Sequence, residues 1–384
     1  MKIISINGRD GIGKTEQIKM LNGDDRFHFT GKLTDYSKRW IEFNPVDGFN
    51  WWFRDVPFME LTSIILESLK ARRITYESNK ININDRGSLM FKAVCAATLA
   101  TREQRSVVDV INLIDGLFED EIKECKLDEN EILFIPDTEY ELRIKPLINI
   151  ANKKESQYLP WQTEMYSKYQ DFLSYFIDHY FQNLIVDNKI CVNNCIIDIH
   201  NKLRAIINQI ANTNLPIICE TFERLVAFGG LSESGKSSFA EQLNIDYHFY
   251  RLKIKYFNGV ICNRGIESKS DILGKELLNF FQDHRHIINA SIESLHSDDL
   301  PAYLKLMFGA RLKIVYLDTP KEKRVRRTAK TLNVSQEEAK LSIESKDYTK
   351  LSRGADRVKD IADIVFDNIC DDFQTSFTSF VDLI

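Results

Sequence analysis

Two copies of one glycine-rich motif most constrain what this chain can fold into. Each fits the pattern Gly-x4-Gly-Lys-Ser/Thr, at residues 8–15 and again at residues 230–237. Each follows a short apolar run, residues 3–6 or 225–228, and precedes a helical pattern. The order strand, glycine loop, helix is the one that a phosphate-binding P-loop requires. The sequence therefore predicts two P-loop units, one in each half of the chain.

Strand and helix patterns alternate in both halves of the 384 residues. Short apolar runs predict further strands near 81–84, 132–135, 184–187, 287–292, 312–317 and 364–367. Helical periodicity covers 57–72, 88–104, 139–151, 160–182, 270–284, 299–307, 320–331 and 335–346. Such alternation is typical of parallel sheets covered by helices on both faces. We therefore expect an α/β protein with two P-loop NTPase domains of nucleotide-kinase type, each a parallel sheet flanked by helices.

A polar segment that ends in proline, residues 212–216, precedes the second unit. It predicts a boundary between a first domain at 1–212 and a second at 213–384. Residues 105–130 show poor periodicity, and an alternative interpretation treats them as a loose insertion.

Charge and composition exclude some classes of binding partner. With 51 basic and 56 acidic side chains the net charge is −5, so no basic field favours nucleic acid as a partner. No apolar run approaches the 18 or so residues of a membrane span, so we expect no membrane partner. Seven scattered cysteines do not suggest a secreted disulfide framework, and the first strand leaves no space for a signal peptide. These features predict a cytoplasmic protein.

The two loops predict ATP binding with Mg²⁺. Glycines let backbone N–H groups turn toward a phosphate, and the helix N-terminus adds positive partial charge. Lys14 and Lys236 would reach the β- and γ-phosphates, and the hydroxyls of Thr15 and Ser237 would hold the metal ion. The expected ATP-binding residues are Gly8, Asp10, Gly11, Gly13, Lys14 and Thr15, and then Gly230, Ser234, Gly235, Lys236, Ser237 and Ser238.

Two absences favour one branch of P-loop proteins. The chain has no Asn-Lys-x-Asp segment of the kind that reads guanine, and no apolar strand that runs into Asp-Glu as in motor ATPases. Small-molecule kinases remain, in which the P-loop opens the domain and arginines close over the phosphates.

Residues 1–210 resemble the thymidylate kinase family. The resemblance rests on residues 6–17, with an acidic residue inside the loop, on Asp85-Arg86 after a strand, and on residues 132–138 with Arg143 beyond them. It implies that Asp85 assists the metal or orients the acceptor, and that Arg86 holds the acceptor phosphate. It also implies that Arg143 approaches the transferring phosphoryl group. A surface ion pair and a solvated helical arginine are the alternative interpretations.

Residues 223–384 are similar to the dephospho-CoA kinase and nucleoside-monophosphate kinase group. The similar segments are 228–238, 313–320 and 362–368. The resemblance implies that Arg324 and Arg327, after the strand at 313–318, act in a lid, although they could also form a solvated helix face. At the end of the strand at 287–292, Glu293 is a candidate acceptor base or metal contact, and His296 is a weaker one.

Together these features predict ATP-dependent phosphoryl transfer by a tandem kinase in which either one half or both halves (a bifunctional enzyme) are active. The acceptor would be a nucleoside or deoxynucleoside monophosphate or a related small phosphorylated metabolite. A nucleotide-sensing protein with one or both sites non-catalytic is the alternative, and a nucleic-acid 5′-end kinase is disfavoured by the acidic charge. A homodimer is compatible with the sequence.

Overall fold

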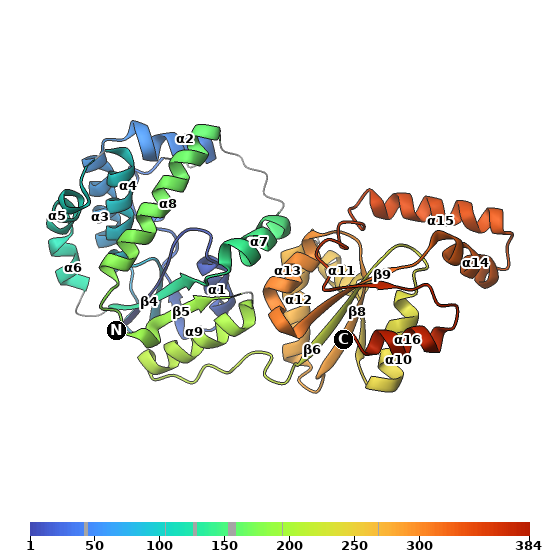
Figure 1. Ribbon diagram of the computed structural model, residues 1–384. Helices are drawn as coiled ribbons and strands as arrows, with labels where there is room; N and C mark the ends of the chain where they lie inside the picture. Colours follow the sequence, from blue (N-terminus) through green and yellow to red (C-terminus); the bar gives the residue numbers. More distant parts are fainter. Residues whose placement is uncertain (42–44, 104, 126–128, 153–158, 194, 268) are drawn as a thin grey trace. The chain divides into compact units, whose positions relative to one another are not determined.

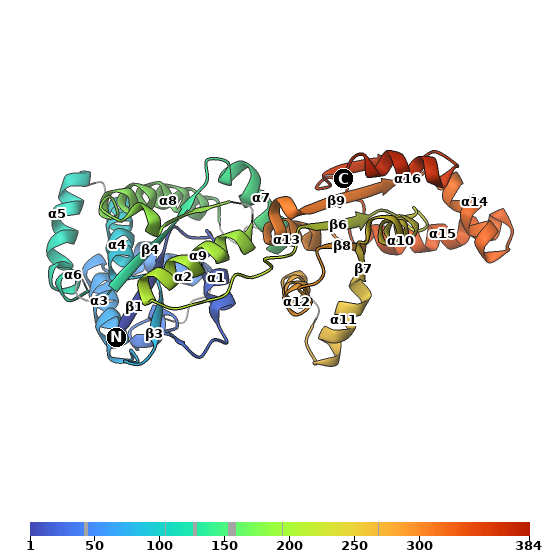
Figure 2. The ribbon, with the colours of Figure 1, turned by 90° about the horizontal axis from the view of Figure 1, so that it is seen from below.

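A computed structural model describes residues 1–41, 45–103, 105–125, 129–152, 159–193, 195–267 and 269–384. These residues form two five-stranded sheets in which every strand pair is parallel, and helices flank each sheet (Figures 1 and 2). The predicted α/β class is confirmed. The chain divides into two compact units. The first comprises Met1–Thr138, Glu155–Asn193 and Asp198–Pro216, and the second comprises Glu139–Lys154, Asn194–Ile197 and Ile217–Ile384.

The first unit has the strand order β2-β3-β1-β4-β5. Its strands are β1 (Lys2–Asn7), β2 (Phe27–Phe29), β3 (Ile81–Asp85), β4 (Glu129–Pro136) and β5 (Lys189–Val192). Its helices are α1 (Lys14–Leu21), α2 (Pro45–Asn50), α3 (Phe58–Ile74), α4 (Ser88–Arg102), α5 (Val107–Leu117), α6 (Glu119–Cys125), α8 (Pro160–Tyr180) and most of α9 (Ile196–Ala211). One π-helical turn, Trp51–Asp55, follows α2.

The second unit repeats this topology with the order β7-β8-β6-β9-β10. Its strands are β6 (Arg224–Gly229), β7 (Tyr250–Lys253), β8 (Asn289–Leu295), β9 (Leu312–Asp318) and β10 (Ile364–Asp367). Its helices are α7 (Lys145–Asn152), α10 (Lys236–Tyr247), α11 (Ile254–Asn263), α12 (Ser270–Asp283), α13 (Asp299–Phe308), α14 (Lys321–Leu332), α15 (Gln336–Leu351) and α16 (Phe373–Val381). In each unit the strand before the P-loop is therefore central in the sheet. It lies between the strands that come third and fourth along that unit of the chain, β3 and β4 around β1, and β8 and β9 around β6.

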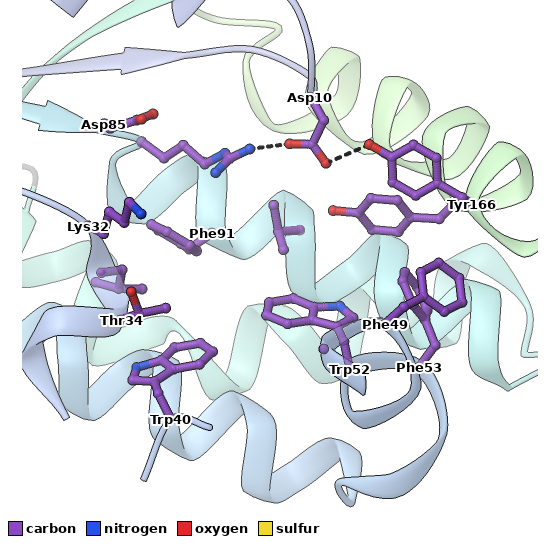
Figure 3. A pocket seen from close by; sticks show the side chains of 15 residues that line it. Asp10, Lys32, Thr34, Trp40, Phe49, Trp52, Phe53, Asp85, Phe91 and Tyr166 are labelled. Carbon is purple, nitrogen blue, oxygen red and sulfur yellow. Dashed lines mark hydrogen bonds and ion pairs between the residues drawn. The ribbon is translucent and has the colours of Figure 1, made fainter. Parts of the chain in front are cut away.

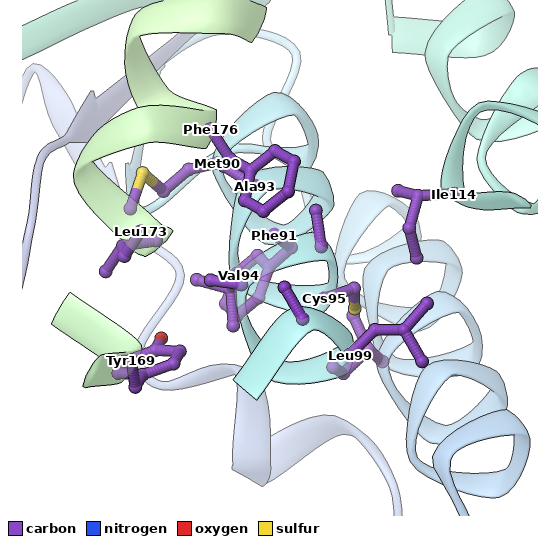
Figure 4. Close-up of a cluster of buried hydrophobic side chains, with 14 of the residues drawn as sticks. Met90, Phe91, Ala93, Val94, Cys95, Leu99, Ile114, Tyr169, Leu173 and Phe176 are labelled. Carbon is purple, nitrogen blue, oxygen red and sulfur yellow. The ribbon is translucent and has the colours of Figure 1, made fainter. Parts of the chain in front are cut away.

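The main core of the first unit lies between α4 and α8, which run side by side. Figure 4 shows Met90 and Val94 of α4 near Leu173 and Phe176 of α8. Alanines fill much of the rest of α4 and are fully or nearly fully buried, so the helix can approach its neighbours closely. This packing supports the end of β3, where α4 begins.

Two expectations about the first half are wrong. The run at 184–187 is not a strand, and the strand lies at β5 instead, because Ile185 and Val186 are exposed whereas Ile190 and Val192 are buried. Residues 105–130 are not a loose insertion, since α5 and α6 occupy most of the described part of that segment.

Smaller differences concern short or irregular elements. Strands β2 and β7 have three and four residues and were not expected, because edge strands this short carry little apolar pattern. The helix expected at 139–151 begins with a π-helical turn at Tyr140–Ile144 before α7. Ser335 and Glu338 form a capping box at the start of α15. Among the described helices, none combines the length and apolar character needed to cross a membrane.

Candidate phosphate-binding sites

Both glycine loops have the backbone that phosphate binding requires. Gly13 and Gly235, which cap α1 and α10, have φ of 92° and 103°. The first glycine of each loop also has positive φ and lies against the fourth strand of its sheet. A Cβ at Gly8 would lie 2.7 Å from the carbonyl oxygen of Phe134, and one at Gly230 would lie 2.7 Å from that of Leu317. Only glycine fits at these two positions.

The lysine of each loop folds back over the loop. The ammonium of Lys14 donates to the carbonyl oxygens of Gly8 and Arg9, both at 2.8 Å. Lys236 repeats the pattern, with 2.8 Å to the carbonyl oxygen of Gly230. Burial lowers the pKa of each lysine to about 7. A buried ammonium that contacts only neutral oxygens is stabilised when an anion binds beside it.

A hydroxyl and a carboxylate lie together beside each lysine. Thr15 donates to Asp85 at 3.2 Å, and Ser237 donates to Glu293 at 2.5 Å. Both carboxylates stand at the carboxyl end of the third strand, next to the P-loop strand. The second carboxylate oxygen of Asp85 is buried without a hydrogen-bond partner among the described residues. Hard oxygen ligands in this arrangement fit Mg²⁺.

The residue after each carboxylate is left-handed although it is not glycine. Arg86 has φ of 70° and Ser294 has φ of 78°. The backbone of Arg86 is held by Arg72, whose guanidinium donates to its carbonyl oxygen at 2.9 Å. Strained backbone of this kind persists only where the surroundings hold it in place. Arg86 and Ser294 thus occupy equivalent places in the two sheets.

The guanidinium of Arg86 forms an ion pair with Asp10 of the first loop. Tyr166 and Gln170 of α8 also donate to the Asp10 carboxylate, at 3.2 and 3.3 Å. Burial alone would raise the pKa of Asp10, but Arg86, Lys14 and these hydrogen bonds together lower it. Asp10 is therefore a carboxylate at neutral pH, and Arg86 stands charged at the edge of the loop.

A cavity of about 590 Å³ opens beside this ion pair. Figure 3 shows its charged end at Asp10, Asp85 and Lys32 and its aromatic end at Trp40 and Trp52. The indole nitrogens of both tryptophans are engaged, by Ser68 and Thr98, which leaves ring faces rather than polar groups to line the space. The remaining lining residues are Leu33, Thr34, Gly48, Phe49, Phe53, Arg86, Phe91, Val94, Tyr166 and Tyr169. A planar apolar group joined to an anion matches such a cavity.

The second site is built differently around its carboxylate. Arg251 of β7 pairs with Glu293, which is buried. Arg324 is also buried and pairs with Asp347 at 2.6 Å. Arg327 lies beside Gly235, where its guanidinium would be 3.5 Å from an added Cβ. Both predicted lid arginines therefore lie at the loop, because Arg324 donates to the carbonyl oxygen of Ser232, but Arg324 is also enclosed in its ion pair with Asp347.

Three predicted residues remain to be placed. Arg143 is exposed, pairs with Glu139 at 2.9 Å and belongs to the second unit, so its role toward the first loop stays a prediction. Ser238 and Gly11 are exposed at the loops. Sequence reasoning missed Gln170 and Arg251. For Gln170 a signal was available, because it follows Tyr166 by one helical turn and so shares its face. For Arg251 the sequence offered no signal.

Comparison with known proteins gives fold-level likeness only. No protein-family model matches the chain, and no curated protein matches it. A thymidylate kinase from Candida albicans is 15% identical over 56% of this chain and 96% of its own, with a TM-score of 0.35. An uncharacterized protein from Eubacterium ventriosum (14% identity, 42% of this chain and 98% of its own, TM-score 0.34) is also similar. So is the protein TT1252 from Thermus thermophilus (13%, 42% and 96%, TM-score 0.30).

Proposed function

We propose that the chain is an ATP-dependent phosphotransferase whose first half phosphorylates a nucleoside or deoxynucleoside monophosphate. The observation that carries this proposal is the Arg86–Asp10 pair between the P-loop and the aromatic cavity. A triphosphate on the loop and a flat base among the rings would place an acceptor phosphate at Arg86. A planar guanidinium suits a phosphate at that point.

The chemistry would rest on position and charge. Lys14 and the N-terminus of α1 would hold the β- and γ-phosphates, and Arg86 would exchange Asp10 for the acceptor phosphate. Thr15 and Asp85 would hold Mg²⁺, which supplies charge neutralisation at the phosphates when bound. Tyr166 and Gln170 would keep Asp10 in place while Arg86 is engaged elsewhere. Holding both reactants in line accounts for most catalysis of this kind.

One observation favours a second candidate function for the second half. Ser294 stands where the first half has Arg86, so no acceptor clamp occupies that place. A loop that binds a triphosphate without such a clamp fits a nucleotide-sensing role. Arg251 does not take the place of Arg86 here, because its guanidinium is already paired with Glu293. We therefore propose nucleotide binding for the second half and transfer for the first.

The test measures ADP formation from ATP and Mg²⁺ with each nucleoside and deoxynucleoside monophosphate and with dephospho-CoA. We expect turnover with at least one monophosphate, lost in Lys14→Ala and retained in Lys236→Ala. Arg86→Gln should raise KM for the acceptor about tenfold or more, since a charged hydrogen bond contributes roughly 1.5–3 kcal/mol.

Lys19→Ala serves as the matched control, because Lys19 lies on α1 outside the loop. Loss of turnover only in Lys236→Ala would move the chemistry to the second half. Tight ATP binding to both halves without turnover on any acceptor would favour sensing instead.

A further inference from the structure

One face of α15 lies against the second glycine loop. Asp347 accepts a hydrogen bond from the backbone N–H of Ser232 at 3.2 Å, and the ammonium of Lys346 is 3.8 Å from the carboxylate of Glu233. Lys350 follows these two residues by one helical turn, so it shares their face. The last turn of α15 therefore carries Lys350 to the loop.

Arg324 fixes this arrangement. Its guanidinium bonds the carboxylate of Asp347 at 2.6 Å and the carbonyl oxygen of Ser232 at 3.2 Å. The pair is buried and joins α14, α15 and the loop. The two helices also pack against each other through Val325 of α14 and Ile343 of α15. A buried pair that is already satisfied is poorly available to a ligand. Arg324 is therefore a positioning residue for α15.

Three basic side chains at this place, Lys350, Arg353 and His296, form no ion pair with the residues that the structure describes. Within the described residues, neither Lys350 nor Arg353 has a carboxylate at ion-pairing distance, and Nδ1 of His296 is buried without a hydrogen bond. These basic groups are also close enough to affect one another's pKa. Burial and then Lys350 lower the pKa of Lys236, and burial followed by Lys350, Lys236 and Arg353 lowers the pKa of His296 to about 4. The carboxylates that act on these cations, Asp347, Glu233 and Glu293, are each paired with another basic residue, namely Arg324, Lys346 and Arg251. The cluster therefore keeps an excess of positive charge, which favours an anion beside it.

We propose that Lys350 and Arg353 bind, together with Lys236, the terminal phosphate of a nucleoside triphosphate in the second site. The inference rests on the proposed nucleotide binding by the second loop. The loop amides and Lys236 would account for the β-phosphate, and the two further cations, in the last turn of α15 and just after it, would be left for the terminal phosphate. The second site should therefore distinguish triphosphates from diphosphates.

The test measures binding of ADP and of a slowly hydrolysed ATP analogue to full-length Lys14→Ala protein by calorimetry, so that the second loop is the one reported. Added to this background, Lys350→Gln or Arg353→Gln should weaken analogue binding about tenfold and ADP binding less than about twofold, as expected for one charged hydrogen bond. Lys340→Gln is the matched control, because Lys340 is exposed on the same helix, and it should change neither. Circular dichroism checks that each variant is folded.

The outcomes separate the two proposals. If the Lys14→Ala protein binds neither nucleotide, nucleotide binding by the second half is wrong, and this inference falls with it. If it binds both and Lys236→Ala abolishes that binding, the function stands. An unchanged preference for the analogue over ADP in Lys350→Gln and Arg353→Gln, or an equal loss for both nucleotides, would then overturn this inference alone.

Discussion

At the residue scale, each site depends on a few side chains in costly environments. Lys14 and Lys236 are buried against carbonyl oxygens, and Arg86 has a left-handed backbone. Such features lower the stability of the ligand-free protein and are typical of functional sites. The cost of these features can be measured as a change in the free energy of unfolding.

The stability of the protein should rise with pH because of its P-loop lysines. The pKa of Lys14 is about 7 in the folded chain and 10.5 in its ordinary state. Between these values the unfolded chain binds more protons, so the free energy of unfolding increases with pH through that window. Urea unfolding at pH 6 and pH 9 measures it. We expect Lys14→Met to be more stable than the natural protein at pH 6, with a smaller difference at pH 9. A constant difference would contradict the lowered pKa.

Gly8→Ala should destabilise the first unit more than Gly11→Ala. Both glycines have positive φ, but the new Cβ at Gly8 would meet the backbone of Phe134, whereas nothing lies within 4 Å of one at Gly11. We expect about 1 kcal/mol for Gly11→Ala and at least about 2 kcal/mol more for Gly8→Ala. Urea unfolding compares the two. Equal losses would mean that the close approach to β4 is relieved by movement of the loop.

At the scale of elements, helices position the sites by packing. The α4–α8 core holds the helix that begins after Arg86 and the helix that carries Tyr166. The repeated strand order brings each carboxylate beside its loop hydroxyl, across 70 residues in the first unit. The site is therefore a property of element packing as much as of the motifs.

Phe176→Ala should destabilise the first unit by about 3–5 kcal/mol, because it removes a fully buried ring between α4 and α8. Tyr175→Ala is the matched control, since Tyr175 is half exposed on the same helix, and it should cost less than about 1 kcal/mol. Denaturant unfolding measures both. A small effect of Phe176→Ala would show that the neighbouring side chains close the cavity.

At the scale of the whole molecule, the two compact units do not each follow one continuous stretch of sequence. The segment Glu139–Lys154, with α7, belongs to the second unit and packs on α13. Cutting the chain at 212 would therefore remove α7 from its packing partner.

A fragment of residues 213–384 should consequently be less stable than the same unit in the intact chain. It lacks α7 and exposes the surface of α13 that α7 covers. Thermal unfolding of the fragment, compared with the nucleotide-responsive transition of the second loop in the intact chain, measures the loss. An unchanged midpoint would show that α7 adds nothing to that unit.

Some elements of the fold were predictable from the sequence and others were not. The fold class, most helices and the central strands were predictable, since apolar periodicity is local. The strand at 184–187 was misplaced because its apolar residues are exposed, and only packing distinguishes them from Ile190 and Val192. Residues 105–130 were misjudged although Val110, Ile114 and Phe118 are buried at helical spacing.

The two loops are predictable from the sequence alone, because strand, glycines, lysine and hydroxyl are consecutive and their geometry is local. The sequence also pointed to Asp85 and Arg86 through the resemblance to thymidylate kinases, and to Glu293 through its place at a strand end. Three ion pairs became visible only in the folded chain: Arg86 with Asp10, Arg324 with Asp347, and Arg251 with Glu293. Those pairs join distant segments, and the order of strands and the packing of helices, which no local pattern records, bring them together.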